Sequence, residues 1–391
     1  MIDRIGKGML LLLIPILFVF SSCEKIGIGW EYDKVVLLYI AANNNLNSFA
    51  LENVESLKSG YIPSVKDKNI LLVYKHISGF KPELVRLFKD QSGNVVEDVV
   101  AAYEDHNSAS PETLKGVLNK MKTIFPSDEY GLILWSHASG WLPKGMYGSA
   151  KAPGARFDDP FASIVKSFGE DRGAEMEIAQ LKGAIPFKLD YIIFDCCFMG
   201  GIEVAYELRK KADFIMAAPT EILATGFPYD KVIRPLFKFH TDLPEVANIY
   251  FNEYAPEDPA NATVYNSATI AIYDTDELEE LATVCEEIFA TNRSKLPLVD
   301  RYSVQPYFRL GQDYFFDLED FISKIASPSE MVRFKECLDD AVTEKWATKK
   351  FLDIPIDKYS GLSVYIPRVT EGNAEVFYKT LEWNQKTKLV N

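Results

Sequence analysis

The sequence predicts an α/β fold in which a mostly parallel central sheet carries helices on both faces and is followed by a carboxyl-terminal α+β extension. Two observations lead to this class. Residues 34–42 (KVVLLYIAA) and 189–195 (LDYIIFD) are near-continuous apolar runs, typical of strands buried on both faces of a parallel sheet. Segments with helical periodicity separate such runs, and strands that alternate with helices favour a sheet covered on both sides.

Local signals place each element in order. The strand at 34–42 ends at three consecutive asparagines, 43–45, which indicate a loop. A helix from Ser110 to residue 125 has Ser as its N-cap and Pro111 at its first position. The other expected elements are strands at 69–76, 83–89 (an edge strand), 130–136, 214–218, 268–273 and 362–367, and helices at 46–59, 200–211 and 276–293. Residues 141–175 lack periodicity and are expected to form a long exposed excursion.

Length and charge exclude some classes of protein. The chain has 391 residues, of which 48% are hydrophobic and 25% charged, as in ordinary globular proteins. This composition excludes disordered and collagen-like chains, and the length is ample for a full core. Lys and Arg number 42 against 56 Asp and Glu, a formal net charge of −14. We expect no nucleic-acid partner, because such binding needs a positive face.

The amino terminus has the pattern of an export signal. Arg4 and Lys7 precede an apolar run at 9–20, and Ser21-Ser22-Cys23 follows. Twelve residues span only about 18 Å as a helix, too short for a hydrocarbon core of about 30 Å. The small residues before Cys23 resemble a bacterial lipoprotein signal, which implies cleavage before Cys23 and lipid on that residue. The alternative is a plain secretory signal with a coincidental cysteine.

The positions of the cysteines indicate a candidate nucleophile. Five occur, and Cys196 and Cys197 are adjacent. A disulfide between neighbours is strained, so one of the two is expected to remain a thiol in an oxidising compartment and is a candidate nucleophile. The alternative is a pair of small buried side chains at a strand end. Cys285 and Cys337 fall in helical patterns, and whether they pair is left open by the sequence.

Two predicted strands end in reactive side chains. Strand 130–136 leads into His137, and strand 189–195 leads into Cys197. Ligands of parallel sheets bind beyond the carboxyl ends of the strands, so neighbouring strands would bring the imidazole and the thiol together. A nearby imidazole and the dipole of the helix at 200–211 would both favour the thiolate. The spacing is similar to that of caspases, whose His lies about 50 residues before the Cys.

These motifs resemble the clostripain family of cysteine peptidases. That family has a strand ending in His-Gly-x-Gly-Trp and another ending in Asp-Ala-Cys-x-Met-Gly. The chain has His137-Ala138-Ser139-Gly140-Trp141 and Asp195-Cys196-Cys197-Phe198-Met199-Gly200 at these places. Further matches lie at 39–46, where Asn43 stands in place of the commoner Asp, and at 203–208, 226–229, 317–318 and 359–365. The resemblance covers about residues 33–370 and implies a caspase-like three-layer sandwich.

The resemblance also implies a mechanism. Cys197 would attack the scissile carbonyl, and His137 would transfer the protons. Backbone N–H groups of Cys197 and Ala138 would bind the oxyanion. Ala138 replaces the family's Gly, and we expect it to carry the cost of a positive φ there, altering rate or loop shape.

The resemblance further implies specificity for Arg or Lys, because in the family the acid two residues before the nucleophile selects these side chains. Asp195 stands at that place, and its carboxylate would pair with the substrate cation. The alternative role for Asp195 is to cap the helix that begins near Gly200. Glu221 is a weaker second candidate for the substrate pocket. Some members of the family cleave themselves after a basic residue in the region of the excursion, which holds Lys144, Lys151 and Arg156. Lys151 is the expected site.

The sequence therefore predicts a signal peptide at 1–22, a lipidated tether at 23–32, a catalytic domain at 33–245 and an extension at 246–391 packed on the same sheet. The expected function is an exported endopeptidase anchored by lipid on Cys23 to a bacterial outer membrane or cell surface, with peptides or proteins bearing Arg or Lys as substrates. We expect no cofactor or metal; calcium dependence, known in parts of the family, is left open. The alternative functions are an inactive peptide-binding lipoprotein and a structural surface protein.

Overall fold

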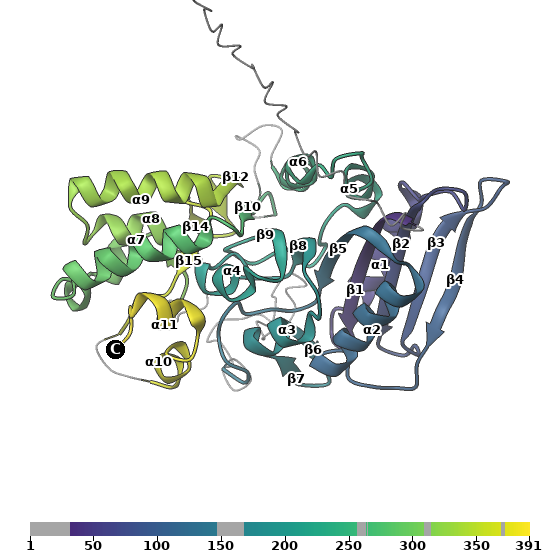
Figure 1. Cartoon of the computed structure of the whole chain (residues 1–391), viewed down its shortest axis with the longest axis horizontal. Helices are drawn as coiled ribbons and strands as arrows, with labels where there is room; N and C mark the ends of the chain where they lie inside the picture. The colour runs from purple at the N-terminus through teal and green to yellow at the C-terminus, as the bar shows by residue number, and fades with distance from the viewer. Residues whose placement is uncertain (1–31, 147–167, 256–262, 264, 309–313, 369–371) are drawn as a thin grey trace, which may run out of the picture. The chain divides into compact units, whose positions relative to one another are not determined.

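A nine-stranded sheet organises the residues that the computed structural model describes, which are 32–146, 168–255, 263, 265–308, 314–368 and 372–391 (Figure 1). The strands lie in the order β12-β10-β9-β8-β5-β1-β2-β3-β4. Their bounds are β1 Tyr32–Ala42, β2 Asn69–Ile77, β3 Glu83–Lys89, β4 Val95–Ala102, β5 Ser127–Trp135, β8 Leu189–Asp195, β9 Ala212–Ala217, β10 Thr269–Asp274 and β12 Val342–Ala347. The pairs from β9 through β8, β5 and β1 to β2 are parallel, and the two pairs at each end are antiparallel.

Helices cover both faces of this sheet, as the sequence predicts. Alternate residues of β1 point to opposite sides, so Val35 and Leu37 enter one core while Val36 and Leu38 enter the other. The first core packs under α2 (Pro111–Ile124), α3 (Ile178–Ala184), α4 (Ile202–Leu208) and α7 (Leu278–Thr291). The second packs under α1 (Asn47–Ser59), α5 (Tyr229–Leu236) and α6 (Leu243–Tyr254). This three-layer arrangement confirms the α/β prediction.

Local predictions hold in the sheet centre and fail at its rim. The Ser110 hydroxyl accepts a hydrogen bond from Thr113 N at 3.3 Å, which confirms it as the N-cap of α2. The expectation that 83–89 forms an edge strand is wrong, because β4 pairs with β3 and takes the edge. In β4 (VVEDVVAA) the charged pair Glu97-Asp98 divides the apolar residues and most side chains are exposed, so the strand lacks the long buried run that marks the central strands. The expected strand at 362–367 is only β15 (Ser363–Val364).

The carboxyl-terminal part belongs to the same compact unit. β10 and β12 extend the main sheet, and position 245, the expected boundary, falls inside α6. The other elements there are η2 Leu296–Leu298, η3 Arg301–Ser303, β11 Phe316–Asp317, α8 Leu318–Ser323, α9 Pro328–Ala341, β13 Lys350–Phe351, β14 Ile354–Pro355, α10 Asn373–Tyr378 and α11 Glu382–Thr387. α7, α8 and α9 gather near β12 (Figure 1).

Hydrogen bonds join this part to the segment that follows β8. Ser363 N donates to Gly200 O at 2.9 Å. The carboxylate of Glu203, on α4, accepts from Tyr365 N and from the Tyr378 hydroxyl, each at 2.8 Å. Glu203 is buried, and its burial raises the pKa of this carboxyl to about 7. The carboxyl-terminal part therefore supports the helix next to the predicted nucleophile.

Several predictions fall outside the described residues: the signal and lipidation at Cys23, and the self-cleavage candidates Lys151 and Arg156. Within the described ranges, no helix is at once long enough and apolar enough to span a bilayer. Cys285 and Cys337, whose pairing the sequence left open, are not joined by a disulfide.

Candidate active site

The strands that carry His137 and Cys197 are neighbours. β5 and β8 run parallel, with Trp135 opposite Asp195 at their carboxyl ends. Residues 135–137 from one strand end and 195–197 from the other line a single small cavity, which Leu46 and residues 222–224 complete. Its volume is about 20 Å³, room for about one water molecule. The structure thus brings together the two side chains that the sequence predicts to react, and it closes the space around them.

His137 is buried and is held from two sides. Its carbonyl accepts a hydrogen bond from Gly169 N at 3.1 Å, on β6 (Phe168–Asp171), which forms a hairpin with β7 (Ala174–Met176). Its ring Nε2 lies 2.7 Å from Oδ1 of Asn45, in the loop after β1. Asn45 is not among the site residues that the sequence predicts. The available signal was that β1 is a central parallel strand whose carboxyl end reaches the same edge of the sheet.

The Cys197 thiol lies against the backbone of Ile222. Ile222 N donates to Cys197 Sγ at 3.3 Å, and the sulfur lies 3.6 Å from Ile222 O. The thiol thus accepts from one backbone group of Ile222 and donates to the other. α4 begins at Ile202 rather than residue 200 and has only seven residues, so the expected dipole effect has a weaker source.

Backbone strain occurs next to the nucleophile position, but not where it was expected. Ala138 is not among the residues with positive φ, so the predicted cost of Ala at that place is wrong. Positive φ occurs instead at Phe198 (61°) and Gly140 (62°). Phe198 is held by stacking on Phe315, with ring centroids 4.7 Å apart, and its N–H donates to Thr220 O at 2.8 Å. Non-glycine residues in this conformation cluster at functional sites.

Cys196 points away from Cys197, as expected for consecutive residues at a strand end. Its Sγ lies 3.0 Å from Leu134 O, inside the core. Burial raises the pKa of the Cys196 thiol well above its ordinary value. A buried thiol of this kind is unreactive, and this leaves Cys197 as the candidate nucleophile.

Asp195 lines the cavity and is bound by the segment that joins β9 to α5 and by the first residue of α5. One carboxylate oxygen accepts from Phe227 N at 3.1 Å and from the Tyr229 hydroxyl at 2.8 Å. Burial raises the pKa of Asp195 to about 7, against the lowering effect of these two bonds. The alternative role as a helix cap is wrong, because Gly201 is the N-cap of α4. Glu221, the second candidate, is buried beside the lining segment 222–224.

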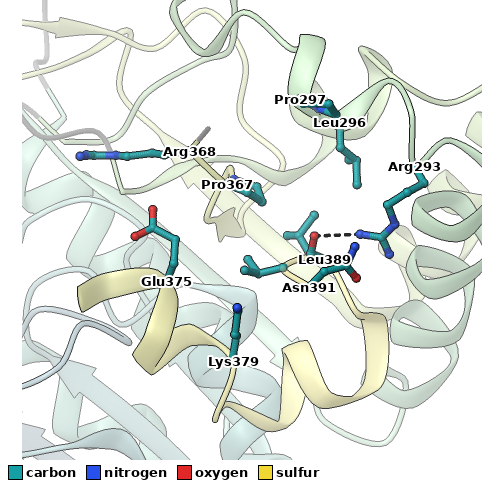
Figure 2. A pocket seen from close by; sticks show the side chains of 10 residues that line it. Arg293, Leu296, Pro297, Pro367, Arg368, Glu375, Lys379, Leu389 and Asn391 are labelled. Atoms are coloured by element: carbon teal, nitrogen blue, oxygen red, sulfur yellow. Dashed lines mark hydrogen bonds between the residues drawn. The ribbon is translucent and has the colours of Figure 1, made fainter. Parts of the chain in front are cut away.

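Other features of the described residues do not add to this site. No group of three or more His, Cys, Asp or Glu in the described ranges could hold a metal ion, and the calcium question stays open. A larger pocket, about 320 Å³, lies in the carboxyl-terminal part and shares no residue with the cavity at the strand ends (Figure 2). Its Arg293 guanidinium donates to Leu389 O at 3.0 Å, so this cation already binds the chain's own backbone.

Known proteins resemble this chain over most of its length. The model of the clostripain family matches residues 38–388. An inactive zymogen of a C11 protease from Parabacteroides distasonis is 30% identical, with a TM-score of 0.78 over 92% of this chain and 99% of that one. A secreted C11 cysteine protease from Bacteroides thetaiotaomicron, solved with an irreversible peptide inhibitor, is 28% identical, with a TM-score of 0.77 over 92% and 100% of the two chains. These likenesses confirm the expected caspase-like fold.

Clostripain from Hathewaya histolytica is 27% identical over 224 residues. That match covers 51% of this chain and 41% of clostripain, so the chain spans less than half the length of this curated relative.

The contacts of Asp195 predict that a side chain at Gly226 would destabilise the fold. Gly226 has a φ of +67°, and a Cβ there would lie 2.7 Å from Asp195 Oδ2 and 2.8 Å from Asn53 Oδ1. We expect Gly226→Ala to lower the free energy of unfolding in urea by about 3 kcal/mol, because strain and overlap add. Gly79→Ala is the matched control, since φ there is +88° and nothing lies within 4 Å of a Cβ. Equal losses in the two variants would contradict the crowding around Asp195.

Proposed function

The chain belongs to the clostripain family of cysteine peptidases, and we propose that it is an exported, lipid-anchored endopeptidase that cleaves after Arg or Lys. The observation that carries the proposal is the shared cavity of His137 and Cys197, which lie at the ends of adjacent parallel strands. A thiol and an imidazole that line one cavity are the minimum for nucleophilic hydrolysis of an amide.

The reaction follows from these two groups. The Cys197 proton passes to His137, and the thiolate adds to the scissile carbonyl to form a tetrahedral oxyanion. The C–N bond then breaks as the imidazolium protonates the leaving amine, which leaves a thioester on Cys197. Water, activated by the neutral imidazole, hydrolyses the thioester and restores the thiol. Ile222 N–H, 3.3 Å from the sulfur, supports the thiolate in the first step.

The oxyanion would be bound by the backbone N–H groups of Cys197 and Ala138. Both residues are buried at the strand ends, where hydrogen bonds to developing charge are little screened by water. The positive φ values of Phe198 and Gly140 shape the two loops that present these groups. A Cβ on Gly140 would lie 2.6 Å from Phe198 O, so the two loops approach closely because residue 140 is glycine.

Asp195 is the proposed partner of the substrate Arg or Lys. Its carboxylate lines the same cavity as Cys197, two residues away along the strand. The present cavity of about 20 Å³ cannot admit a guanidinium, and Tyr229 occupies one carboxylate oxygen. Substrate entry therefore requires the segment that holds residues 222–229 to move. A closed site agrees with a chain that is made inactive, and a similar chain was solved as an inactive zymogen. Self-cleavage after Lys151 is the proposed activating step.

The nucleophile is tested by comparing the two adjacent cysteines. We expect Cys197→Ala to lower cleavage of an Arg or Lys fluorogenic peptide at least about a thousandfold, because the thioester cannot form. Cys196→Ala is the matched control and should retain activity within a few-fold, since its thiol faces Leu134 in the core. Intact mass should show fragments for the wild type and one uncut chain for Cys197→Ala. Turnover by Cys197→Ala would refute the peptidase mechanism, and a fully active uncut wild-type chain would refute self-cleavage.

The role of Asp195 predicts binding that depends on pH. With a pKa of about 7, the carboxyl is largely neutral at pH 6 and largely charged at pH 8. In a Cys197→Ala background, calorimetry should show a peptide with Arg at the cleaved bond binding about tenfold more tightly at pH 8 than at pH 6. Asp195→Asn should bind weakly at both pH values. The same peptide with norleucine in place of Arg is the control, and an equal pH response for the two peptides would exclude Asp195 as the cation's partner.

The anchor is tested at Cys23, which lies outside the described residues. In a host that lipidates exported proteins, Cys23→Ser should move the chain from the membrane fraction to the soluble exported fraction, because no thioether-linked lipid can form. Fractionation and labelling with a fatty-acid analogue measure this. Unchanged membrane retention without label incorporation would contradict the lipid anchor and leave a different mode of attachment.

A further inference from the structure

We propose that Asn45 is a positioning residue, which accepts a hydrogen bond from His137 Nε2–H and thereby leaves Nδ1 as the nitrogen that exchanges a proton with Cys197. Asn43 and Asn44 hold Asn45 in place by anchoring its loop to the β6–β7 hairpin. The inference rests on the proposed Cys197–His137 chemistry, and it adds a third side chain to it. A base oriented by a third group is a recurring arrangement in nucleophilic catalysis.

Each of the three asparagines binds a different partner. Asn43 Nδ2 donates to Asp171 Oδ1 at 2.8 Å, and Asn44 Nδ2 donates to Glu170 O at 2.7 Å. Asn45 Oδ1 lies 2.7 Å from His137 Nε2. Two of the three contacts thus reach the hairpin and the third reaches the imidazole, so the loop bridges the two.

Asp171, the anchor of Asn43, is itself fixed by buried groups. Ser108 donates to Asp171 Oδ2 from its backbone N at 2.7 Å and from its hydroxyl at 2.9 Å. His76 Nδ1 lies 3.0 Å from the same oxygen, an ion-pair distance at an angle poor for a hydrogen bond. Neither the Asp171 nor the His76 side chain is more than 2% exposed. The anchor is therefore rigid compared with the exposed end of the loop.

The β6–β7 hairpin also forms hydrogen bonds with the chain at Ser136 and His137. Gly169 N donates to His137 O at 3.1 Å, and Glu170 N donates to the Ser136 hydroxyl at 3.2 Å. The same hydroxyl donates to Ala41 O at 2.7 Å, at the end of β1. The hairpin thus binds the main chain of His137, and Asn45 binds its ring. The loop that carries Asn45 is itself bound to Asp171 and Glu170 of the hairpin.

The chemistry assigns a tautomer. With Nε2–H directed at an amide oxygen, the neutral ring has its lone pair on Nδ1, which takes the proton from Cys197 Sγ to give thiolate and imidazolium. The imidazolium keeps its bond to Asn45, so the ring does not need to reorient when it protonates the leaving amine. Asn45 is exposed on the other side, where water competes for its amide. Its contribution is therefore about tenfold in rate rather than thousands.

Substitutions of Asn45 test whether its side-chain amide accepts a hydrogen bond from the His137 ring or donates one to it. Asn45→Asp keeps an acceptor and adds a negative charge, whereas Asn45→Ala removes the partner. Asn119→Asp, on the exposed face of α2, is the control for added charge. The primary measurement is the rate at which iodoacetamide, which reaches Cys197 when residues 222–229 move, alkylates this thiol as a function of pH. Mass spectrometry of the peptide follows the reaction. This reaction needs no peptide substrate.

We expect the alkylation midpoint of Asn45→Asp to move about one unit to higher pH, because the added charge disfavours loss of a proton from the Cys197–His137 pair. Asn45→Ala should show no such rise, and its kcat on an Arg peptide should fall about tenfold while KM changes less than twofold. Asn119→Asp should match the wild type in both measurements. Thermal unfolding of all three should agree within about 2 °C, because the exchanged side chains are exposed.

Two results would overturn the proposal. If Asn45→Asp loses activity as Asn45→Ala does, without a shift of the midpoint, the amide donates to the ring and the tautomer is the opposite one. If neither variant differs from the wild type, Asn45 does not position His137. If the variants show the expected shifts on alkylation but the wild type cleaves no peptide, the peptidase function alone is refuted.

The anchoring step has its own test. Asn43→Asp sets two carboxylates against each other across a contact that is now 2.8 Å, and kcat should fall as in Asn45→Ala. Adding Asp171→Asn restores the hydrogen bond with the roles exchanged, because the amide at position 171 now donates to the carboxylate at position 43. At least half of the lost activity should return. Absence of rescue, with both variants folded by circular dichroism, would show that the loop is not fixed through Asp171.

Discussion

Parallel pairing of β5 with β8 is the constraint on which the rest of the structure depends. The register sets Trp135 opposite Asp195, so His137 and Cys197, each two residues further along its chain, leave the sheet at one edge. Side chains alternate across a strand, and a slip of one residue would turn both to other faces. Buried apolar residues on both faces of β5 and β8 fix this register, which makes the two hydrophobic cores the ultimate source of the site's geometry.

Loops distant in sequence then supply the polar partners that buried reactive groups require. Asp195 is satisfied by Phe227 N and Tyr229, Cys197 by Ile222, and His137 by Asn45. Of these partners Ile222 also lines the cavity, and Asn45 is adjacent to Leu46, which lines it as well. The contacts that stabilise these groups therefore also limit the space for a substrate. If Asp195 binds the substrate's cation as proposed, that cation takes the place of the Tyr229 contact.

The sequence predicts the strands of the sheet centre and the reactive residues at their ends, because long apolar runs and the rule for parallel sheets carry that information. It does not predict β4, in which the charged pair Glu97-Asp98 divides the apolar residues and most side chains are exposed. Nor does it predict the contact of Asp195 with Tyr229 or of His137 with Asn45, which are 34 and 92 residues apart. Those contacts depend on loop paths, and loop paths follow from packing that a single sequence does not show.

Glu203 has a consequence for how this gene can change. One oxygen of its carboxylate, on the helix after Cys197, accepts from Tyr365 N and the Tyr378 hydroxyl, near the opposite end of the chain. We therefore expect positions 203 and 378 to vary together, because recombination between homologues that joins their amino-terminal and carboxyl-terminal halves separates an acceptor from its donor. Natural chimaeras with a crossover between these positions should be rare unless both parents retain the Glu–Tyr pair.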